Sequence, residues 1–362
     1  MKFVFINTGT KRLNAGIIRC LGLGKGLAQL GHEVIILISG DKENIDLYGD
    51  RFDGINFVYT TCRGRGFEQV HKIYQIALQK NVDVVHCMGA GTSIFMPALI
   101  AKFFLRKKFT LIVDYEDKQV LMIPFRQRKL HLFYEALSFR FADKVLCASE
   151  ALAEEYKARN VNTYYLPFAV SLYPSQVIKK AITSCCVNIG YIGSINEAYR
   201  DQIEYLISIY PILKAHFGCV QIHIAGTGSL HHLFISKVRQ LGLEHEIIFY
   251  GFVSDVAICE FFSNVDVMFF YFSDTPLNRY RCPNKVFLCC SYGLPIVANR
   301  IGEVGKILEG YPRCSFFDGS DHRSCIIAIQ SMREVIQAVP QAFYNENNWD
   351  ARVNKYLEII TK

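Results

Sequence analysis

The sequence lacks the features that mark an elongated, secreted or membrane-spanning protein. Only 10 of its 362 residues are proline, which excludes long proline-rich linkers and collagen-like repeats. Its most apolar run, residues 94–105, is interrupted by Pro97 and Lys102 and falls short of the roughly 20 residues that cross a bilayer. The chain opens directly on a strand-like run at residues 2–7, so we expect no signal peptide. With 51% hydrophobic and 20% charged residues, the composition predicts a soluble protein with two packed cores.

The 13 cysteines form no Cys-x-x-Cys pair and have no zinc-ligand spacing. Cys147 and Cys186 lie in apolar strand-like runs, where a thiol acts as a small hydrophobic side chain. We therefore predict reduced thiols in a cytoplasmic protein.

The net charge of +7 is distributed unevenly. Residues 1–171 contain 23 Lys and Arg against 16 Asp and Glu, whereas residues 172–362 contain 17 of each kind. Part of the excess lies in residues 106–108 and in Arg126, Arg128 and Lys129, next to aromatic side chains. Such a surface suits an anionic membrane face or a phosphate-bearing substrate, and no nucleic-acid-binding motif accompanies it. An ordinary solvated surface explains the charge equally well.

Strand-length apolar runs separated by segments of helical spacing occur in two sets. The first set is residues 3–7, 33–39, 55–60, 83–88, 110–114, 144–148 and 163–167, and the second is residues 186–193, 221–225, 246–250, 266–272, 294–298 and 314–317. Continuous apolar runs are typical of parallel strands covered on both faces. The pattern predicts an α/β protein of two Rossmann-like, doubly wound domains, residues 1–171 and 172–344, with a last helix in residues 345–362 packing back on the first domain.

Ligands of open parallel sheets bind at the carboxyl ends of the strands, so two such domains should carry their chemistry on loops facing one cleft. The loop of residues 8–16 follows the first strand and opens a helix, where Gly16 lets a phosphate approach free backbone N–H groups. It is not a Gly-x-Gly-x-x-Gly motif, which argues against a dinucleotide-dependent oxidoreductase. Gly22, Gly24 and Gly26 lie within the helical stripe, and we expect them to serve close packing.

A series of further landmarks follows in order along the chain. They are Gly16 with Arg19, Leu27-Ala-Gln-Leu-Gly31-His32-Glu33-Val34, Asp83-Val-Val-His86, Ala142-Asp143-Lys-Val with Ser149-Glu150, Tyr191-Ile-Gly193, Ile224-Ala-Gly226-Thr-Gly228, Leu241-Gly242-Leu243, Ile248-Phe-Tyr-Gly251-Phe-Val253, Pro283-Asn284-Lys285 and Gly293-Leu-Pro295-Ile-Val297-Ala298. Their order and spacing resemble the GT-B retaining glycosyltransferases of family 4 (glycosyltransferases group 1) over essentially the whole chain. The resemblance implies an amino-terminal acceptor domain, a carboxyl-terminal nucleotide-sugar domain and a reaction that needs no metal or other cofactor.

The resemblance also implies site residues. Lys285, next to Asn284, matches the diphosphate lysine of the family, and the amide of Gly16 would complete the diphosphate cradle. The family arginine directly after Gly193 is Ser194 here, and Arg200 is the available replacement, with a solvated helix charge as the alternative interpretation. The backbone near Val253 matches the stretch that contacts the base.

Other positions depart from the family. Its two glutamates are replaced by Tyr280 and Leu288, and leucine cannot accept a hydrogen bond from ribose. Glu116 stands where a family histidine contacts the donor sugar. It could accept a proton or a sugar hydroxyl, and a capping or ion-paired loop acid remains the alternative.

Asn14 and His86 are candidate acceptor-binding residues, although a core histidine satisfied by its neighbours is the slightly favoured interpretation of His86.

The resemblance implies a hexosyltransferase-type enzyme that moves a sugar with retention from a nucleotide sugar, UDP-linked by expectation, to a hydroxyl acceptor. We expect a lipid-linked or small-molecule acceptor, in the synthesis of a cell-surface polysaccharide or glycolipid. The enzyme would be cytoplasmic, with a possible peripheral position on the inner face of the cell membrane through Arg126, Arg128 and Lys129. The alternatives are a catalytically degenerate relative that acts as a binding or scaffold subunit and, less favoured, an oxidoreductase.

Overall fold

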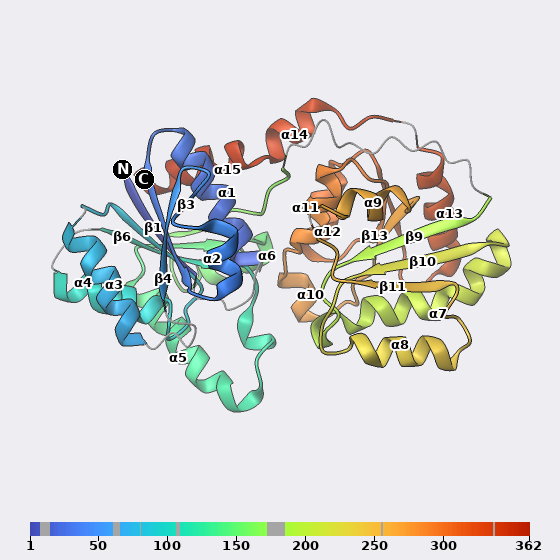
Figure 1. Ribbon diagram of the computed structural model, residues 1–362, viewed down its shortest axis with the longest axis horizontal. Helices are drawn as coiled ribbons and strands as arrows, with labels where there is room; N and C mark the ends of the chain where they lie inside the picture. Colours follow the sequence, from blue (N-terminus) through green and yellow to red (C-terminus); the bar gives the residue numbers. More distant parts are fainter. Residues whose placement is uncertain are drawn as a thin grey trace. The chain divides into compact units, whose positions relative to one another are not determined.

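The computed structural model describes residues 1–7, 15–60, 66–79, 81–105, 109–171, 185–254, 256–335 and 337–362. The chain forms two compact units (Figure 1). Unit 1 consists of Met1–Ala169, Tyr280–Cys282 and Asn347–Lys362, and unit 2 consists of Val170–Arg279 and Pro283–Glu346. Tyr280–Cys282 therefore belongs to unit 1 although its neighbours on both sides belong to unit 2, which the sequence analysis did not foresee. Residues 172–184, which directly follow the predicted boundary between the two domains, lie outside the described residues.

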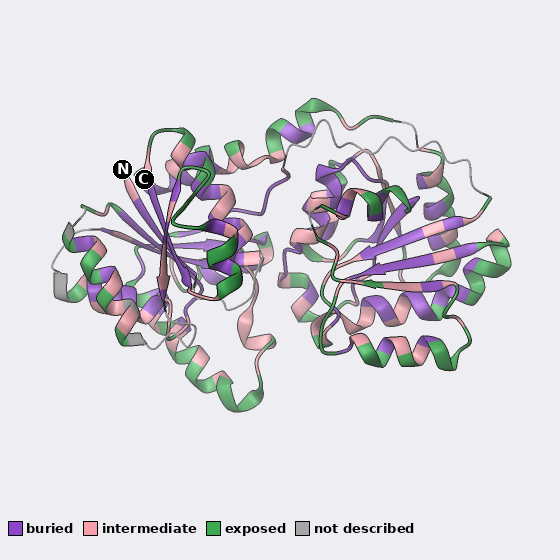
Figure 2. Ribbon diagram, viewed as in Figure 1, coloured by how far each residue is buried: buried purple, intermediate pink, exposed green. Residues whose placement is uncertain are grey.

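Unit 1 is built on an eight-stranded sheet with the order β3-β4-β2-β1-β5-β6-β7-β8. The pairs are parallel except for β3 with β4. The strands are β1 (Lys2–Asn7), β2 (Glu33–Ser39), β3 (Arg51–Phe52), β4 (Ile55–Thr60), β5 (Val84–Met88), β6 (Thr110–Tyr115), β7 (Lys144–Cys147) and β8 (Thr163–Tyr165). Figure 2 shows the central strands as buried, which explains their continuous apolar sequences.

Helices cover both faces of this sheet, because alternate residues of one strand enter different apolar clusters. Phe3 and Phe5 pack with α1 and α15, whereas Val4 and Ile6 belong to the cluster that includes residues of α3 to α6. The helices are α1 (Ala15–Gln29), α2 (Lys42–Tyr48), α3 (Gly66–Gln79), α4 (Phe95–Leu105), the short 3₁₀ helix η1 (Gln119–Leu121), α5 (Phe125–Phe141), α6 (Glu150–Lys157) and α15 (Trp349–Thr361). Unit 1 is thus doubly wound.

The carboxyl-terminal helix α15 packs closely on α1. A Cβ atom at Gly22 would lie 2.2 Å from the Trp349 ring, and one at Gly26 would lie 2.6 Å from the Val353 side chain. Only glycine fits at these two positions, so the packing role predicted for the glycines of this helix is confirmed there.

Unit 2 contains a six-stranded parallel sheet with the order β11-β10-β9-β12-β13-β14. Its strands are β9 (Val187–Ile192), β10 (Val220–Ala225), β11 (Ile247–Gly251), β12 (Val267–Phe270), β13 (Ile296–Asn299) and β14 (Cys314–Phe317). Its helices are η3 (Glu197–Tyr199), α7 (Arg200–Phe217), α8 (His231–Gln240), α9 (Ile258–Ser263), α10 (Pro276–Tyr280), α11 (Asn284–Ser291), α12 (Gly302–Glu309), α13 (His322–Arg333) and α14 (Gln341–Asn347). Two doubly wound α/β units confirm the predicted fold class. Among the described helices, none has the length and apolar character needed to span a bilayer.

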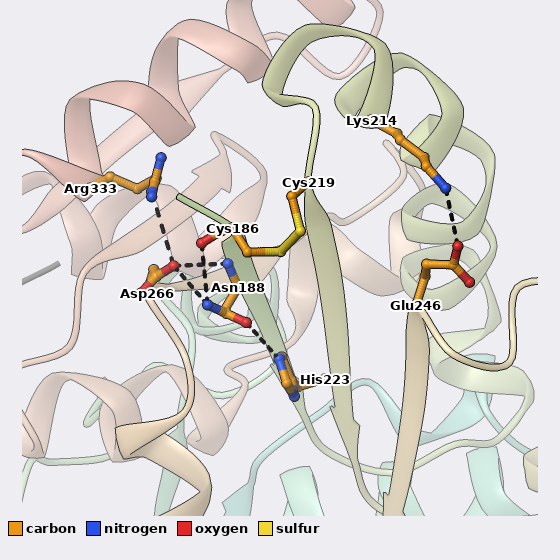
Figure 3. Close-up of a disulfide and its surroundings, with 8 residues drawn as sticks. All are labelled: Cys186, Asn188, Lys214, Cys219, His223, Glu246, Asp266 and Arg333. Atoms are coloured by element: carbon orange, nitrogen blue, oxygen red, sulfur yellow. Dashed lines mark hydrogen bonds and ion pairs between the residues drawn. A yellow bond between two sulfur atoms is a disulfide. The ribbon is translucent and has the colours of Figure 1, made fainter. Parts of the chain in front are cut away.

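A disulfide joins the amino ends of the two adjacent strands β9 and β10 (Figure 3). Cys186 and Cys219 each precede their strand by one residue, and their Cα atoms are 4.5 Å apart. The prediction of a free thiol at Cys186 is therefore wrong. The apolar surroundings of Cys186 give no sign of a disulfide, and its partner can be identified only once β9 and β10 are known to be neighbours.

A polar cluster lies beside the disulfide. Asp266 Oδ2 accepts hydrogen bonds from the backbone N of Asn188 at 2.8 Å and from its Nδ2 at 3.2 Å (Figure 3). The amide oxygen of Asn188 is 3.1 Å from His223 Nε2. Covalent and polar contacts therefore secure this edge of unit 2, opposite the edge where the strands end.

Candidate active site

Two glycine-containing loops lie against each other at the carboxyl ends of β9 and β10. Gly193 N donates to Ala225 O at 3.0 Å, and Ile195 N donates to Thr227 O at 2.9 Å. A Cβ atom at Gly226 would lie 1.8 Å from Gly193 O, so no other residue fits there. The loops form a close backbone surface at the sheet edge where open α/β folds bind ligands.

Lys285, the second residue of α11, extends into this region. A Cβ atom at Gly193 would lie 3.0 Å from the Lys285 side chain, so the structure brings these two predicted site residues together. The ammonium donates to Gln202 Oε1 at 2.7 Å and to Tyr191 Oη at 3.2 Å. Tyr191 Oη in turn donates to the carbonyl oxygen of Ser194 at 3.1 Å, which links a further predicted residue to the cluster.

Aromatic rings surround the same ammonium. Its distances to the ring centroids are 4.4 Å for Tyr191, 4.5 Å for Tyr199, 5.5 Å for Phe270 and 5.6 Å for Phe272. Ring faces attract a cation without carrying a charge. We call Lys285, Gln202 and these four rings the lysine cluster.

Arg200 is held differently. It begins α7, and its guanidinium binds Glu197 at 2.7 and 2.8 Å and Glu204 at 3.3 Å. Its side chain is 36% exposed. The two carboxylates offset its charge, so a role at the diphosphate would require the guanidinium to exchange partners, and that role stays a prediction.

The other predicted donor residues of unit 2 lie on strand-end loops and helix starts. Asn284 is the first residue of α11, and Val253 follows β11; both are half-buried. Asp201, which the sequence analysis missed, accepts hydrogen bonds from the backbone N of Ser273 at 2.9 Å and from Asn278 Nδ2 at 3.1 Å. It fixes the start of α7 to the loop after β12.

A second polar cluster lies in unit 1, and its members are all buried. Arg19 Nε donates to Asp114 Oδ2 at 2.6 Å, and its terminal nitrogens donate to Leu166 O at 2.6 Å and Pro167 O at 3.1 Å. Asp114 Oδ2 is 3.1 Å from His86 Nε2, and His86 Nδ1 is 2.8 Å from Tyr356 Oη of α15. The guanidinium and the histidine contact hold the pKa of Asp114 below its usual range despite its burial. We call these four side chains the arginine cluster.

The arginine cluster accounts for His86. The ring is fully buried, and both of its nitrogens contact protein groups. Burial lowers the pKa of His86, so the ring is neutral near pH 7. Its placement does not support the predicted direct contact with an acceptor. The other acceptor candidate, Asn14, lies outside the described residues, and Gly16 is a buried residue of the first turn of α1.

Glu116 directly follows β6, two residues beyond Asp114. Burial, and then the nearby carboxylates of Asp114 and Asp117, raise the pKa of Glu116 to about 8. Its Oε1 atom is buried and has no hydrogen-bond partner among the described residues. The raised pKa favours the protonated form of this carboxyl group near pH 7, in which it can donate a hydrogen bond, and its role as a proton acceptor stays a prediction.

Sequence reasoning missed Gln202 as well as Asp201, and it saw Arg19 only as a landmark. The signal for Arg19 was a charged residue between Ile17 and Cys20, two residues that are buried with it. Gln202 gave no comparable signal, because a glutamine early in a helix is ordinary.

The chain is similar to known glycosyltransferases in both units. A family described as Glycosyltransferase Family 4 matches residues 18–163, and one described as Glycosyl transferases group 1 matches residues 186–339. The protein is thus a glycosyltransferase of the GT-B fold. It resembles the group 1/family 4 glycosyltransferases in both units, as the sequence motifs indicated.

Individual relatives are distant in sequence. MJ1607, an uncharacterized glycosyltransferase of Methanocaldococcus jannaschii, is 23% identical over 315 residues, which cover 81% of this chain and 78% of that protein. The Anabaena protein HepE, solved with UDP and glucose, has a TM-score of 0.72 at 16% identity, with both chains covered completely. The lipopolysaccharide outer core galactosyltransferase WaaB has a TM-score of 0.65 at 15% identity, covering 100% of this chain and 99% of its own. At these identities the two solved structures support the fold.

Proposed function

We propose that the protein transfers a sugar from a UDP-linked donor to a hydroxyl acceptor, with retention of configuration, in the synthesis of a cell-surface polysaccharide or glycolipid. The lysine cluster carries this proposal, because it places a cation beside close-packed backbone loops at the edge of the sheet where the strands end. The presence of UDP and glucose in HepE, and the lipopolysaccharide substrate class of WaaB, support the same donor and pathway class here.

Departure of a nucleoside diphosphate builds negative charge on the leaving oxygens while the sugar becomes oxocarbenium-like. A fixed cation at those oxygens stabilises the transition state more than the ground state. Lys285 supplies this charge in the proposal, and Arg200 adds a second cation once it exchanges its carboxylate partners. Because two side-chain cations perform this role, we propose that turnover needs no divalent metal and continues in the presence of a chelator.

Glu116 has a separate role in the proposal. A protonated carboxyl group with a buried, unpartnered oxygen can donate a hydrogen bond to a sugar or acceptor oxygen. Glu116 would thereby orient a hydroxyl group.

The decisive experiment screens nucleotide sugars for hydrolysis and transfer with the wild type, Lys285→Ala and Arg200→Ala. We expect a UDP-sugar to be consumed and each variant to lower turnover by roughly tenfold or more, about 1.4 kcal/mol. Arg239→Ala removes an exposed cation of α8 in the same unit and is the matched control. Unchanged turnover in Lys285→Ala, with the fold intact by circular dichroism, would remove the proposed donor site.

A second candidate function is a non-catalytic relative that keeps the fold as a binding or scaffold subunit. The replacement of the two family glutamates by Tyr280 and the half-buried Leu288 favours it. Calorimetric binding of UDP without consumption of any nucleotide sugar would establish this alternative. We also expect Leu288→Glu to be tolerated or to tighten UDP binding if the ribose lies beside α11.

We further propose that α5 brings the enzyme to an anionic membrane and so to a lipid-linked acceptor. Three apolar side chains of this helix are largely exposed: Phe125 at 79%, Leu130 at 56% and Phe133 at 56%. Arg126 and Lys129 are exposed between them, and the guanidinium of Arg128 lies 5.9 Å from the Phe125 ring centroid. Each cation near an anionic surface contributes on the order of 1 kcal/mol.

Sedimentation with liposomes tests the membrane proposal. The wild type should bind anionic vesicles at low salt and bind them less at moderate salt, and Arg126→Ser/Lys129→Ser should bind weakly. Equal sedimentation with neutral and anionic vesicles would show that charge does not drive binding, and no sedimentation with anionic vesicles even at low salt would favour a soluble acceptor instead.

A further inference from the structure

Gln202 holds the proposed donor lysine from a buried position. It is the third residue of α7 and is 1% exposed. Its Oε1 accepts from Lys285 Nζ at 2.7 Å, the shorter of the two hydrogen bonds that the ammonium makes in the lysine cluster. The oxygen assignment follows from chemistry, because an ammonium can only donate.

The nitrogen of the same side-chain amide lowers the stability of the folded state. Gln202 Nε2 is buried and has no hydrogen-bond partner among the residues that the structure describes. An unpaired buried donor destabilises the folded state. A glutamate would hold the ammonium at least as well and would bring no N–H group, so stability alone does not explain the amide.

The neutral charge of the amide explains better why residue 202 is a glutamine. A carboxylate at this position would form a buried ion pair with Lys285 and weaken the attraction of its charge for an anion. The amide, the Tyr191 hydroxyl and the four ring faces orient the ammonium without adding negative charge.

We propose that Gln202 is a positioning residue that fixes Lys285 for the diphosphate of the donor while leaving the lysine charge available. This inference rests on the proposed donor site. It predicts that the charge of residue 202, more than its size, sets the affinity for a nucleoside diphosphate.

The test measures UDP binding by calorimetry between pH 5 and pH 8 for the wild type, Lys285→Ala, Gln202→Glu and Gln202→Leu. Gln202→Glu should weaken binding tenfold or more throughout this range, because the pair with Lys285 lowers the pKa of the introduced carboxyl group and keeps it ionised. Gln202→Leu should weaken binding severalfold, with the pH dependence of the wild type. Gln240→Glu adds the same charge at an exposed position of α8 and should bind UDP like the wild type.

The outcomes separate this inference from the donor site itself. If Lys285→Ala weakens binding but Gln202→Glu and Gln202→Leu do not, Gln202 has no positioning role and the inference is overturned alone. If neither the wild type nor any variant binds UDP, GDP or ADP, the donor site and the inference both fall. If Gln202→Glu does not fold, Gln202→Leu decides, since wild-type affinity in that variant also overturns the inference.

Discussion

The two units hold a basic side chain in opposite ways. In unit 1, Arg19 is fully buried against the carboxylate of Asp114 and two backbone carbonyl oxygens. In unit 2, the contacts of Lys285 within the lysine cluster are with a hydroxyl, an amide oxygen and ring faces. The arginine cluster offsets its charges internally, whereas the contacts of Lys285 in the lysine cluster are neutral, which suits the proposed role of its charge at the donor diphosphate. The two basic groups thus differ in the charge of their partners, a carboxylate for Arg19 and neutral groups for Lys285 within its cluster.

Breaking the arginine cluster should give the largest effect. Arg19→Met leaves Asp114 buried without its guanidinium, and loss of one partner of a buried pair costs about 3–5 kcal/mol. Denaturant unfolding monitored by fluorescence should show this decrease in the free energy of unfolding. Arg140→Met, at an exposed position of α5, is the control. Arg19→Met/Asp114→Leu should recover part of the loss, and a double variant as unstable as the sum of the single ones would argue against coupling.

The disulfide should give the next largest effect, confined to unit 2. It closes a loop with a sequence separation of 33, so Cys186→Ser/Cys219→Ser should lower the stability of unit 2 by about 2–4 kcal/mol. Calorimetry of the oxidised wild type, the reduced wild type and this variant tests the stabilisation by the disulfide. The reduced wild type and the variant should unfold at the same temperature. Cys185→Ser changes the exposed neighbouring thiol and should leave unfolding unchanged. A wild type insensitive to reductant would show that the pair contributes nothing.

Glu116 should make the stability of unit 1 depend on pH. Its folded-state pKa is about 8, above the 4.5 of an ordinary glutamate, so the folded state keeps a proton that the unfolded state loses. The contribution of this bound proton to the free energy of unfolding is complete below pH 4.5 and is lost as the pH rises toward 8. Glu116→Gln should therefore raise the melting temperature more at pH 8 than at pH 5. Glu154→Gln, at an exposed position of α6, should show no such trend, and a constant difference for Glu116→Gln would contradict the raised pKa.

The smallest expected effect on stability is that of Lys285→Met, and it tests most directly how the two clusters differ. Lys285→Met removes a cation whose partners in the lysine cluster are neutral, so it leaves no buried carboxylate of that cluster behind. We expect the free energy of unfolding to change by about 1.5 kcal/mol or less, the net contribution of a hydrogen bond, while turnover collapses. A loss of stability as large as that of Arg19→Met would mean that both clusters serve the fold.

The sequence predicted the strands that coincide with long apolar runs. The strands of residues 33–39, 55–60 and 314–317 match the structure residue for residue, and each pairs with a parallel neighbour in its sheet. The two-residue strand β3 is too short to have a pattern, and it was missed. In the site, motifs indicated Lys285, but its partner Gln202 follows from packing between α7 and α11. Tyr356 reaches His86 across 270 residues of sequence, a contact that no local pattern encodes.

The path of the chain limits how this enzyme can be recombined with its relatives. Unit 1 includes two segments from the second half of the chain. One is Tyr280–Cys282, where Ser149 Oγ donates to Tyr280 O at 2.6 Å. The other is α15, whose Trp349 and Val353 lie against Gly22 and Gly26. A chimera with a single junction would take Tyr280–Cys282 and α15 from the relative that supplies the second half of the chain. The side chains of that relative's last helix would then lie against Gly22 and Gly26, which fit the α15 of this protein. Exchange of unit 2 therefore requires four junctions. Evolution faces the same constraint, so α1 and α15 are expected to change together even when the rest of the second half is replaced.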